Sequence, residues 1–462
     1  MRSEVLRMER VSCQEQGVIE LDDFNLNILS GEIMGLLPIN NHGLTALLRL
    51  LQYNTPLRYG YVNYREEQVN TWRDSKQRHN RIGLIQSESC LVEGLTVSDN
   101  IFVLRPEFHT WLLRPSALRK QLLPFLESIG VHLSADTHVD ELTGFEKVVV
   151  DVLKSVVAGC KLTLLRDISA NLGEAELKKI HRLLKYYADQ GFSFLYIDFH
   201  LKELKQVCDR VALMSDGRIV KILQSDEITE EFFKNYTGAF QAGQRADLST
   251  ENRRSAVLEA VGLTGILVNN LSFAVAPGEC VVLQSADIQV FEELLAILSG
   301  ELAPQRGEIR VDGRAVPLRI GGDIAMIQEL PTETMLFREM SYLDNLCFLV
   351  DRRLPEVWRD KRVRNGIKYE YEALLGSDVF DKRVDALSEI QKYELVYTRV
   401  AIQKPKAVFC VQPFRRADME LRVHIYGLIK RLLERGIAVV ILVVNLEDSL
   451  SLADRLVRIQ KD

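Results

Sequence analysis

The stretch Gly31-Glu-Ile-Met-Gly-Leu-Leu-Pro38-Ile-Asn-Asn-His-Gly43-Leu44-Thr45-Ala-Leu-Leu48 decides how the rest of the chain is interpreted. An apolar run, a short polar loop with a glycine, and a second apolar run of helical spacing predict a strand, a loop and a helix. Loops of this plan commonly hold a phosphate, because backbone N–H groups surround the anion and the helix N-terminus favours negative charge. The stretch therefore predicts a phosphate-loop type of α/β domain.

The phosphate-loop pattern G-x-x-x-x-G-K-[ST] matches this stretch at two of its four defined positions. Gly43 and the hydroxyl of Thr45 match, whereas Pro38 replaces the first glycine and Leu44 replaces the lysine. The proline removes an N–H donor. The leucine removes a charge-assisted hydrogen bond, which contributes about 1.5–3 kcal/mol.

Two interpretations of this loop remain open. In the first, it is a weakened nucleotide site with Mg²⁺ on the hydroxyl of Thr45, and the binding residues are Asn40, Asn41, Gly43, Leu44 and Thr45. In the second, it is a strand-to-helix turn that is kept for packing. The missing lysine favours the second interpretation.

Composition describes an ordinary globular protein of 462 residues, with 47% apolar and 26% charged residues. The net charge of −6 argues against a nucleic-acid partner. The seven cysteines are scattered without a CxxC pair, which argues against a zinc site and predicts reduced thiols in the cytoplasm. The apolar run 437–444 is too short to cross a membrane, so we expect no membrane span and association with a membrane only through a partner.

The second half of the chain repeats the landmarks of the first half in the same order. "FNLNILSGEIMGLL" is echoed by "LSFAVAPGECVVL", "RIGLIQSE" by "DIAMIQEL", and "DELTGFEK" by "DALSEIQK". Strand patterns alternate with helix patterns in both halves, which indicates mostly parallel sheets covered by helices. We therefore expect two copies of one domain, at residues 1–240 and 241–462.

These motifs, in this order and duplicated, resemble the ATP-binding-cassette (ABC) ATPases. Two cassettes in one chain resemble the double-cassette ATP-binding subunits of bacterial monosaccharide importers of the ribose, galactose and xylose class. The resemblance implies an α/β fold of tandem ABC-ATPase-like domains, each with a mixed, mostly parallel sheet core of the P-loop NTPase type, a β subdomain and a helical subdomain. It also implies ATP and Mg²⁺ as cofactors, membrane permease subunits as partners, and a peripheral location at the inner face of the cell membrane.

The positions that carry chemistry in that family are altered in the first half. The resemblance places Arg166 at the metal-supporting acid and Asp167 at the catalytic glutamate, where Asp167 is a shorter substitute. It places Ser87 at the position of a glutamine, with Gln86 one residue earlier. It places Thr143 and Gly144 in the signature loop that faces the opposite nucleotide.

The second half departs further from the family pattern. The residues from Gln284 to Phe291 contain no glycine, lysine or magnesium-binding hydroxyl at the required positions, and Asp287 adds a negative charge. Gln412 stands at the catalytic glutamate, and Glu389 replaces a signature glycine. We expect no nucleotide in this half.

Three functions are compatible with parts of these patterns. The first is an ABC subunit of a sugar-class importer with little or no ATP hydrolysis. The second is an inactive pseudo-ATPase that acts as a structural or regulatory partner of a permease or of another cassette protein. The third, a ribosome-binding double-cassette factor, requires two working ATP sites and a long basic linker, and the sequence has neither.

Overall fold

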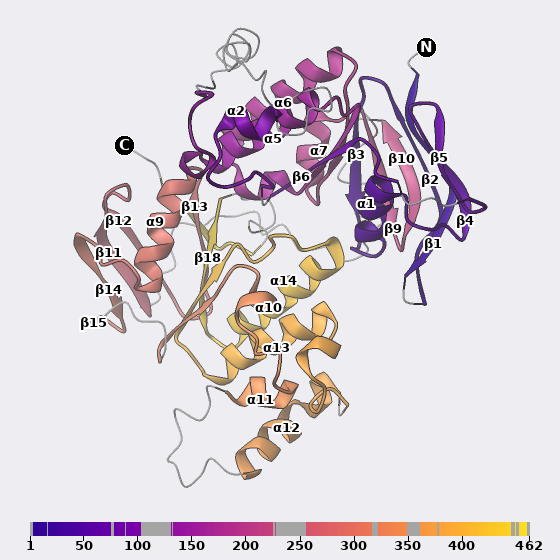
Figure 1. Ribbon diagram of the computed structural model, residues 1–462. Coiled ribbons are helices and arrows are strands. Elements are labelled where there is room, and N and C mark those ends of the chain that lie inside the picture. Colours follow the sequence, from indigo (N-terminus) through magenta and orange to yellow (C-terminus); the bar gives the residue numbers. More distant parts are fainter. Residues whose placement is uncertain are drawn as a thin grey trace. The chain divides into compact units, whose positions relative to one another are not determined.

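The computed structural model (Figure 1) describes most of the chain. The described residues are 3–15, 17–74, 78–87, 89–102, 131, 133–224, 227, 256–316, 322–348, 361–376, 378–444, 449 and 452–459. They form two compact units, unit 1 within Met1–Gly238 and unit 2 within Ala239–Asp462. The expected domain boundary at 240/241 lies outside the described residues. Among the described helices, none has the length and apolar character that a membrane span requires.

Unit 1 contains a small antiparallel sheet at its N-terminal end. Its strand order is β2-β1-β4-β5, and the bounds are β1 Glu4–Glu15, β2 Val18–Leu29, β4 Tyr59–Tyr64 and β5 Glu67–Thr71. Buried and exposed residues alternate along parts of these strands, because one face of the sheet packs against the core. This sheet is the β subdomain of unit 1.

The second sheet of unit 1 is mostly parallel and has the order β10-β9-β3-β8-β7-β6. Its strands are β3 Ile33–Pro38, β6 Ile82–Gln86, β7 Leu162–Arg166, β8 Ser193–Ile197, β9 Arg210–Ser215 and β10 Arg218–Gln224. The edge strand β10 runs antiparallel to β9, and the other pairs are parallel. The central strands are continuous apolar runs because both faces are covered.

Helices of unit 1 pack against this sheet in two apolar clusters. The α-helices are α1 Leu44–Tyr53, α2 Val97–Phe102, α5 Gly144–Val157, α6 Glu174–Asp189 and α7 Leu201–Val207, and the short 3-10 helices are η1 Val139–Glu141 and η2 Ile168–Asn171. One cluster joins α5, α6 and α7 to the sheet. The other joins α1 and the antiparallel sheet to it.

Unit 2 repeats this plan with fewer strands. Its antiparallel sheet has the order β12-β11-β14-β15, with β11 Leu258–Thr264, β12 Leu271–Val275, β14 Arg306–Val311 and β15 Arg314–Val316. Its second sheet has the order β16-β17-β18-β13-β19, with β13 Cys280–Ser285, β16 Ile324–Ile327, β17 Ala407–Val411, β18 Ala438–Val443 and β19 Arg455–Ile459. All pairs in the second sheet are parallel.

Six α-helices and one 3-10 helix are described in unit 2. They are α9 Ile288–Ser299, α10 Pro331–Thr334, α11 Tyr342–Cys347, α12 Lys361–Leu375, η5 Val384–Ala386, α13 Glu389–Ile402 and α14 Met419–Glu434. Figure 1 shows α11, α12 and α13 grouped together, apart from the sheet that holds β11, β12, β14 and β15. Unit 2 therefore has a sheet core, a β subdomain and a helical subdomain.

The same ion pair lies at the start of β3 in unit 1 and at the start of β13 in unit 2. In unit 1 the Nε of Arg210 donates to Glu32 Oε1 at 2.6 Å, and in unit 2 the Nε of Arg455 donates to Glu279 Oε1 at 2.5 Å. Both glutamates follow a glycine and both arginines follow an aspartate in the repeated sequence. These repeated dipeptides are therefore explained by a shared structural contact.

Candidate functional site

The loop between β3 and α1 keeps the backbone turn of a phosphate loop. Five residues, Ile39 to Gly43, connect Pro38 of β3 to Leu44 of α1. Gly43 has a φ of 77°, and a Cβ there would lie 2.3 Å from the carbonyl oxygen of Glu20. Any other residue would clash with β2, so close backbone packing is enough to require this glycine.

The residue at the lysine position points into the core. Leu44 is 1% exposed and belongs to the apolar cluster that joins α1 to both sheets, together with Leu21 and Leu47. Thr45, the next residue, is exposed. The helix therefore uses the lysine position for packing and leaves the hydroxyl of Thr45 on the surface.

The polar residues of the loop contact the protein's own turns. The side-chain amide of Asn40 donates to Asp216 Oδ1 at 2.9 Å, and the Asp216 N–H donates to Asn40 Oδ1 at 3.2 Å. The carbonyl of the exposed Asn41 accepts from the N–H of Leu44 at 3.2 Å. Asp216 lies in the turn between β9 and β10, so a carboxylate is held against a loop that would need to attract phosphate.

The carboxyl ends of β3, β8, β7 and β6 form one edge of the sheet, which is the usual place for a ligand in an open α/β sheet. Asp167 follows β7 at this edge, is buried, and donates its N–H to the carbonyl of Ile197 at 2.9 Å. Its φ of 54° is uncommon for a residue with a side chain. Gln86 ends β6, is half-buried and pairs in register with Arg166. The structure thus brings the loop, Asp167 and Gln86 to the same edge.

A buried polar group that the sequence analysis missed lies at this edge. Asp198 follows β8 and is fully buried, and its carboxylate accepts from Ser169 Oγ at 2.5 Å and from the His200 N–H at 2.8 Å. The Nδ1 of His200 lies 3.0 Å from Asp198 Oδ1. Burial by itself raises the pKa of Asp198, but the hydrogen bonds and the charge of His200 and the bond from Ser169 outweigh it and lower that pKa.

The buried carboxylate of Asp198 fixes the position of His200, the histidine in the connection between β8 and α7. Phe199 occupies the position that the resemblance assigns to a phosphate-contacting histidine, and its side chain is buried in the apolar cluster around α1. The neighbouring His200 is held against Asp198. The Asp-x-His spacing in the sequence could have predicted this contact, because an aspartate often accepts a hydrogen bond from the N–H two residues later.

Thr143 and Gly144 lie at the start of α5, where they cap the helix. The Thr143 N–H donates to Glu146 Oε2 at 2.9 Å, and the Glu146 N–H donates to Thr143 Oγ1 at 3.3 Å. This reciprocal pair is a capping box, which satisfies N–H groups that the helix leaves without partners. Gly144 is exposed, and a Cβ there would meet nothing within 4 Å. Helix capping alone therefore accounts for Thr143, and packing within unit 1 does not require Gly144.

In unit 2 the strand-to-helix loop is shorter and an acid fills it. Two residues, Ala286 and Asp287, separate β13 from α9. The Asp287 carboxylate accepts from the N–H groups of Gln289 and Val290 at 2.9 and 3.3 Å. These are the helix N-terminal donors that a phosphate would use, so an internal carboxylate takes the place of an anion. This loop is shorter than that of unit 1, because α9 begins at Ile288.

At the remaining aligned positions of unit 2, the backbone geometry and the helix cap resemble those of unit 1, but the side chains differ. Gln412 follows β17 with a φ of 42°, and its N–H donates to the carbonyl of Leu442 at 2.8 Å. This is the backbone arrangement of Asp167 in unit 1. Ser388 caps α13 through Gln391, whose N–H donates to Ser388 Oγ at 3.2 Å, and the exposed Glu389 bonds Lys392. Neither arrangement offers a group for phosphate or metal.

The residues at the two loops do not fit an ordinary Mg²⁺-ATP site. Unit 2 presents the Asp287 carboxylate where phosphate would bind. Unit 1 has the buried Leu44 at the lysine position and the cationic Arg166 at the metal-supporting position. A cation there disfavours Mg²⁺. Thr45 keeps a hydroxyl suited to Mg²⁺, and its role stays a prediction, as do those of Asp167, Gln86, Thr143 and Gly144.

Comparisons with known proteins place this chain beside ABC transporter subunits in sequence. The ABC transporter family profile matches residues 21–168. The chain is 23% identical over 472 residues to a xylose import ATP-binding protein of Moorella thermoacetica, covering 98% of this chain and 93% of that protein. It is 24% identical over 452 residues to a ribose import ATP-binding protein of Geobacillus kaustophilus, covering 95% and 91%. Among solved structures, CbiO1 of Clostridium perfringens, part of the ABC transporter complex CbiONQ, aligns with 52% of this chain and 96% of its own at 18% identity and a TM-score of 0.43.

The fold class is therefore α/β, with tandem ABC-ATPase-like domains whose sheet cores are of the P-loop NTPase type. The resemblance to double-cassette ATP-binding subunits of monosaccharide importers is confirmed, since relatives with such names align along nearly the whole chain.

Proposed function

We propose that this chain is the cassette subunit of a sugar-class ABC importer and that it carries out little or no ATP hydrolysis. Full-length similarity to sugar-import ATP-binding proteins supports the importer role. The loss of hydrolysis is inferred mainly from one observation: in each unit a side chain of the protein replaces a feature that phosphate binding requires. Leu44 fills the lysine position of unit 1 with an apolar contact, and Asp287 places a carboxylate on the donors of unit 2.

The proposed partners are membrane permease subunits, which would hold the chain at the inner face of the cell membrane. Each unit has an exposed apolar residue on a rigid support for such a contact. In unit 1 the fully buried Asn100 accepts from the Val92 N–H at 2.8 Å and donates to its carbonyl at 3.1 Å, and Val92 is 50% exposed. In unit 2 the fully buried Asn345 holds Phe337 in the same way, at 2.9 and 3.0 Å.

Unit 2 has the larger apolar surface of the two. The rings of Phe337 and Phe348 lie 4.4 Å apart, and both side chains are about two-fifths exposed. The two neighbouring rings form an exposed apolar patch, and such patches are a feature of protein interfaces. We infer that this surface and Val92 contact permease subunits.

Co-purification with a co-expressed permease tests the partner. Val92→Asp and Phe337→Asp should each reduce the amount of permease recovered, because a charge would enter an apolar contact. Tyr369→Asp is the matched control, since Tyr369 is 83% exposed on α12 and lies outside the proposed surface. Equal recovery with all three variants would contradict the assignment of this surface.

Calorimetric titration with Mg-ATP tests the nucleotide site. We expect no binding heat at millimolar ATP, because the lysine and the metal-supporting acid are both replaced. Micromolar binding that Thr45→Ala weakens would instead support a working site in unit 1. The alternative function, a pseudo-ATPase partner of another cassette protein, predicts co-purification with that protein in place of a permease.

A further inference from the structure

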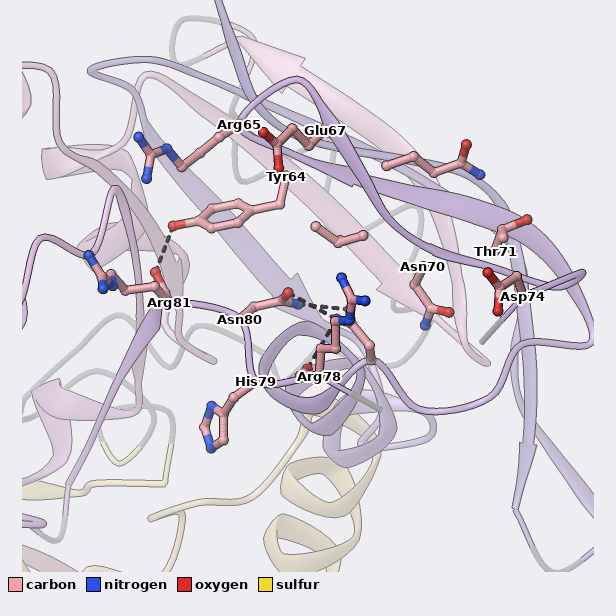
Figure 2. Close-up of a pocket in the computed structure, with 13 residues that line it drawn as sticks. Tyr64, Arg65, Glu67, Asn70, Thr71, Asp74, Arg78, His79, Asn80 and Arg81 are labelled. Atoms are coloured by element: carbon pink, nitrogen blue, oxygen red, sulfur yellow. Dashed lines mark hydrogen bonds between the residues drawn. The ribbon is translucent and has the colours of Figure 1, made fainter. Parts of the chain in front are cut away.

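A second polar pocket lies in unit 1, away from the edge that carries the candidate nucleotide site. It has a volume of about 650 Å³ and lies between the β4–β5 hairpin, the end of α1 and the approach to β6. Figure 2 shows its lining, which is almost wholly polar or charged. The volume is within the range of small-ligand sites, which is roughly 300–1,000 Å³.

The base of the pocket is a rigid amide frame. Asn54 and Asn80 are buried and exchange side-chain hydrogen bonds at 3.0 and 2.8 Å, and Asn80 also donates to the Leu51 carbonyl at 2.7 Å. The hydroxyl of Tyr64 donates to the carbonyl of Arg81 at 2.7 Å. These bonds fix the segment before β6 against α1 and β4, so the lining is preorganised.

One buried acceptor in the lining has no partner. Asn70 is 1% exposed, and its side-chain NH₂ donates to the Thr55 carbonyl at 2.8 Å. Its Oδ1 has no hydrogen-bond partner among the described residues. A buried unpaired acceptor costs about 1–3 kcal/mol. Because this oxygen is closed off from solvent, a ligand hydroxyl would pair with it only after the lining opens at Asn70.

The lining carries three guanidinium groups and two carboxylates, Glu67 and Asp74, and therefore has a net positive charge. Within the described part of the chain, Arg65, Arg78 and Arg81 form no ion pair. By contrast, other arginines of unit 1 lie against carboxylates, as Arg49 does against Glu15 and Arg218 against Asp22. Unpaired guanidinium groups around a preorganised pocket are typical of sites that bind phosphate or carboxylate.

The two kinds of group lie at opposite sides of the pocket. Figure 2 shows Arg65, Arg81 and Glu67 on the side of Tyr64, whereas Asn70, Thr71 and Asp74 are on the other side. The first side has two guanidinium groups against one carboxylate, a net positive charge that suits an anion, and the second side suits hydroxyl donors. Among the described residues of the lining, the only aromatic rings are those of Tyr64, which is buried, and His79, which packs edge-on against Tyr53, so neither offers a platform for a nucleobase.

We propose that this pocket binds a small phosphorylated polyhydroxyl compound, a sugar phosphate, with its phosphate toward Arg65 and Arg81 and its hydroxyls toward Asn70 and Asp74. The site is separate from the candidate nucleotide site and does not depend on the proposed function. It would let the level of a phosphorylated sugar act on the subunit through the β subdomain.

Calorimetric titration of the full chain without ATP tests this, with ribose 5-phosphate as the probe and with ribose and inorganic phosphate as separate arms. We expect ribose 5-phosphate to bind at least about tenfold more tightly than either, since each lacks one half of the contacts. Equal affinity for inorganic phosphate would reduce the site to a simple anion site and overturn the proposal. So would the absence of binding heat at millimolar ribose 5-phosphate.

Variants identify the pocket. The double variant Arg65→Gln and Arg81→Gln should weaken binding of ribose 5-phosphate by at least about tenfold. Arg73→Gln is the matched control, because Arg73 is exposed on the same segment and lies over the ring of Trp72 rather than in the lining. Thermal unfolding of each variant confirms folding. Unchanged binding in the double variant, or equal weakening in Arg73→Gln, would contradict the assignment.

Discussion

The two strand-to-helix loops are copies of one motif that have diverged to different degrees. In unit 1, five residues separate β3 from α1, and Gly43 still adopts the left-handed turn. In unit 2, two residues separate β13 from α9, and Asp287 caps the helix itself. The loop of unit 1 has the left-handed Gly43 and a buried leucine at the position aligned with a lysine, whereas the loop of unit 2 places a carboxylate on the first N–H groups of its helix.

This difference shows that the backbone turn of the loop and its ability to bind a phosphate can be lost independently. Close packing of Gly43 against β2 preserves the turn in unit 1 whether or not a ligand binds. The carboxylate of Asp287 caps α9 through the N–H groups that a phosphate would otherwise use. Single substitutions in either unit can therefore test shape and chemistry one at a time.

The largest effect is expected from restoring the lysine in unit 1. Leu44→Lys should lower the free energy of unfolding of unit 1 by about 3 kcal/mol, because it removes a buried leucine and places a charge in an apolar cluster. Urea denaturation measures this, with the exposed neighbour change Thr45→Ala as the control, expected within about 0.5 kcal/mol. A stable Leu44→Lys variant that binds Mg-ATP would show that Leu44 was the single obstacle.

The stability of the two units is expected to depend differently on pH because of one position in their equivalent helices. This position is the eighth residue after Thr143, which caps α5, and after Ser388, which caps α13. This residue is the buried Asp151 in unit 1 and the buried Val396 in unit 2. Burial raises the pKa of Asp151 from 3.8 to about 6, against the lowering effects of the Ser89 hydrogen bond and Lys154. Its carboxyl therefore binds a proton in the folded state at pH values where the unfolded chain has released it.

Stability of unit 1 should consequently fall as pH rises from about 4 to about 6 and remain lower above that. Asp151→Asn, which keeps a side-chain acceptor for Ser89, should stabilise unit 1 by about 2 kcal/mol at pH 8 and have little effect near pH 4. Thermal unfolding at the two pH values measures both. A stabilisation that is the same at pH 4 and pH 8 would contradict the account.

A smaller effect is expected from removing the internal carboxylate of unit 2. Asp287→Ala should destabilise unit 2 by about 1 kcal/mol, the usual cost of losing a side-chain cap. Hydrogen exchange of the first α9 amides measures this, and Gln289→Ala, an exposed change in the first turn, is the control. If the loss of the Asp287 cap left exchange unchanged, its carboxylate would not be what stabilises the helix.

The smallest effect is expected at the signature glycine of unit 1. Gly144→Ala should stabilise α5 by about 0.5 kcal/mol, since its Cβ meets nothing within 4 Å and alanine restricts the unfolded chain. The same position in unit 2 already holds Glu389. Loss of ATP binding or of permease recovery in Gly144→Ala would show that the glycine serves a ligand or partner.

Much of the architecture could be predicted from the sequence because it depends on local patterns and repeats. The strand, loop and helix around Gly43 and the duplicated halves follow from apolar periodicity and self-similarity. The group of Ser169, Asp198 and His200 was missed, since Asp198 and Ser169 meet only when β7 and β8 pair. The short loop of unit 2 was not predicted either. Alignment of the motif places Val290 opposite Leu44, the first residue of α1, but it does not show that Asp287 caps α9 and that this helix begins at Ile288, two residues before Val290.

Phosphate release by the full chain with millimolar Mg-ATP, alone and with a co-expressed permease, tests the central claim most directly. The account predicts no release above background in either case and no change in Asp167→Asn. Release that Asp167→Asn or Thr45→Ala abolishes would contradict it, because it would mean that the loop of unit 1 supports hydrolysis without the lysine.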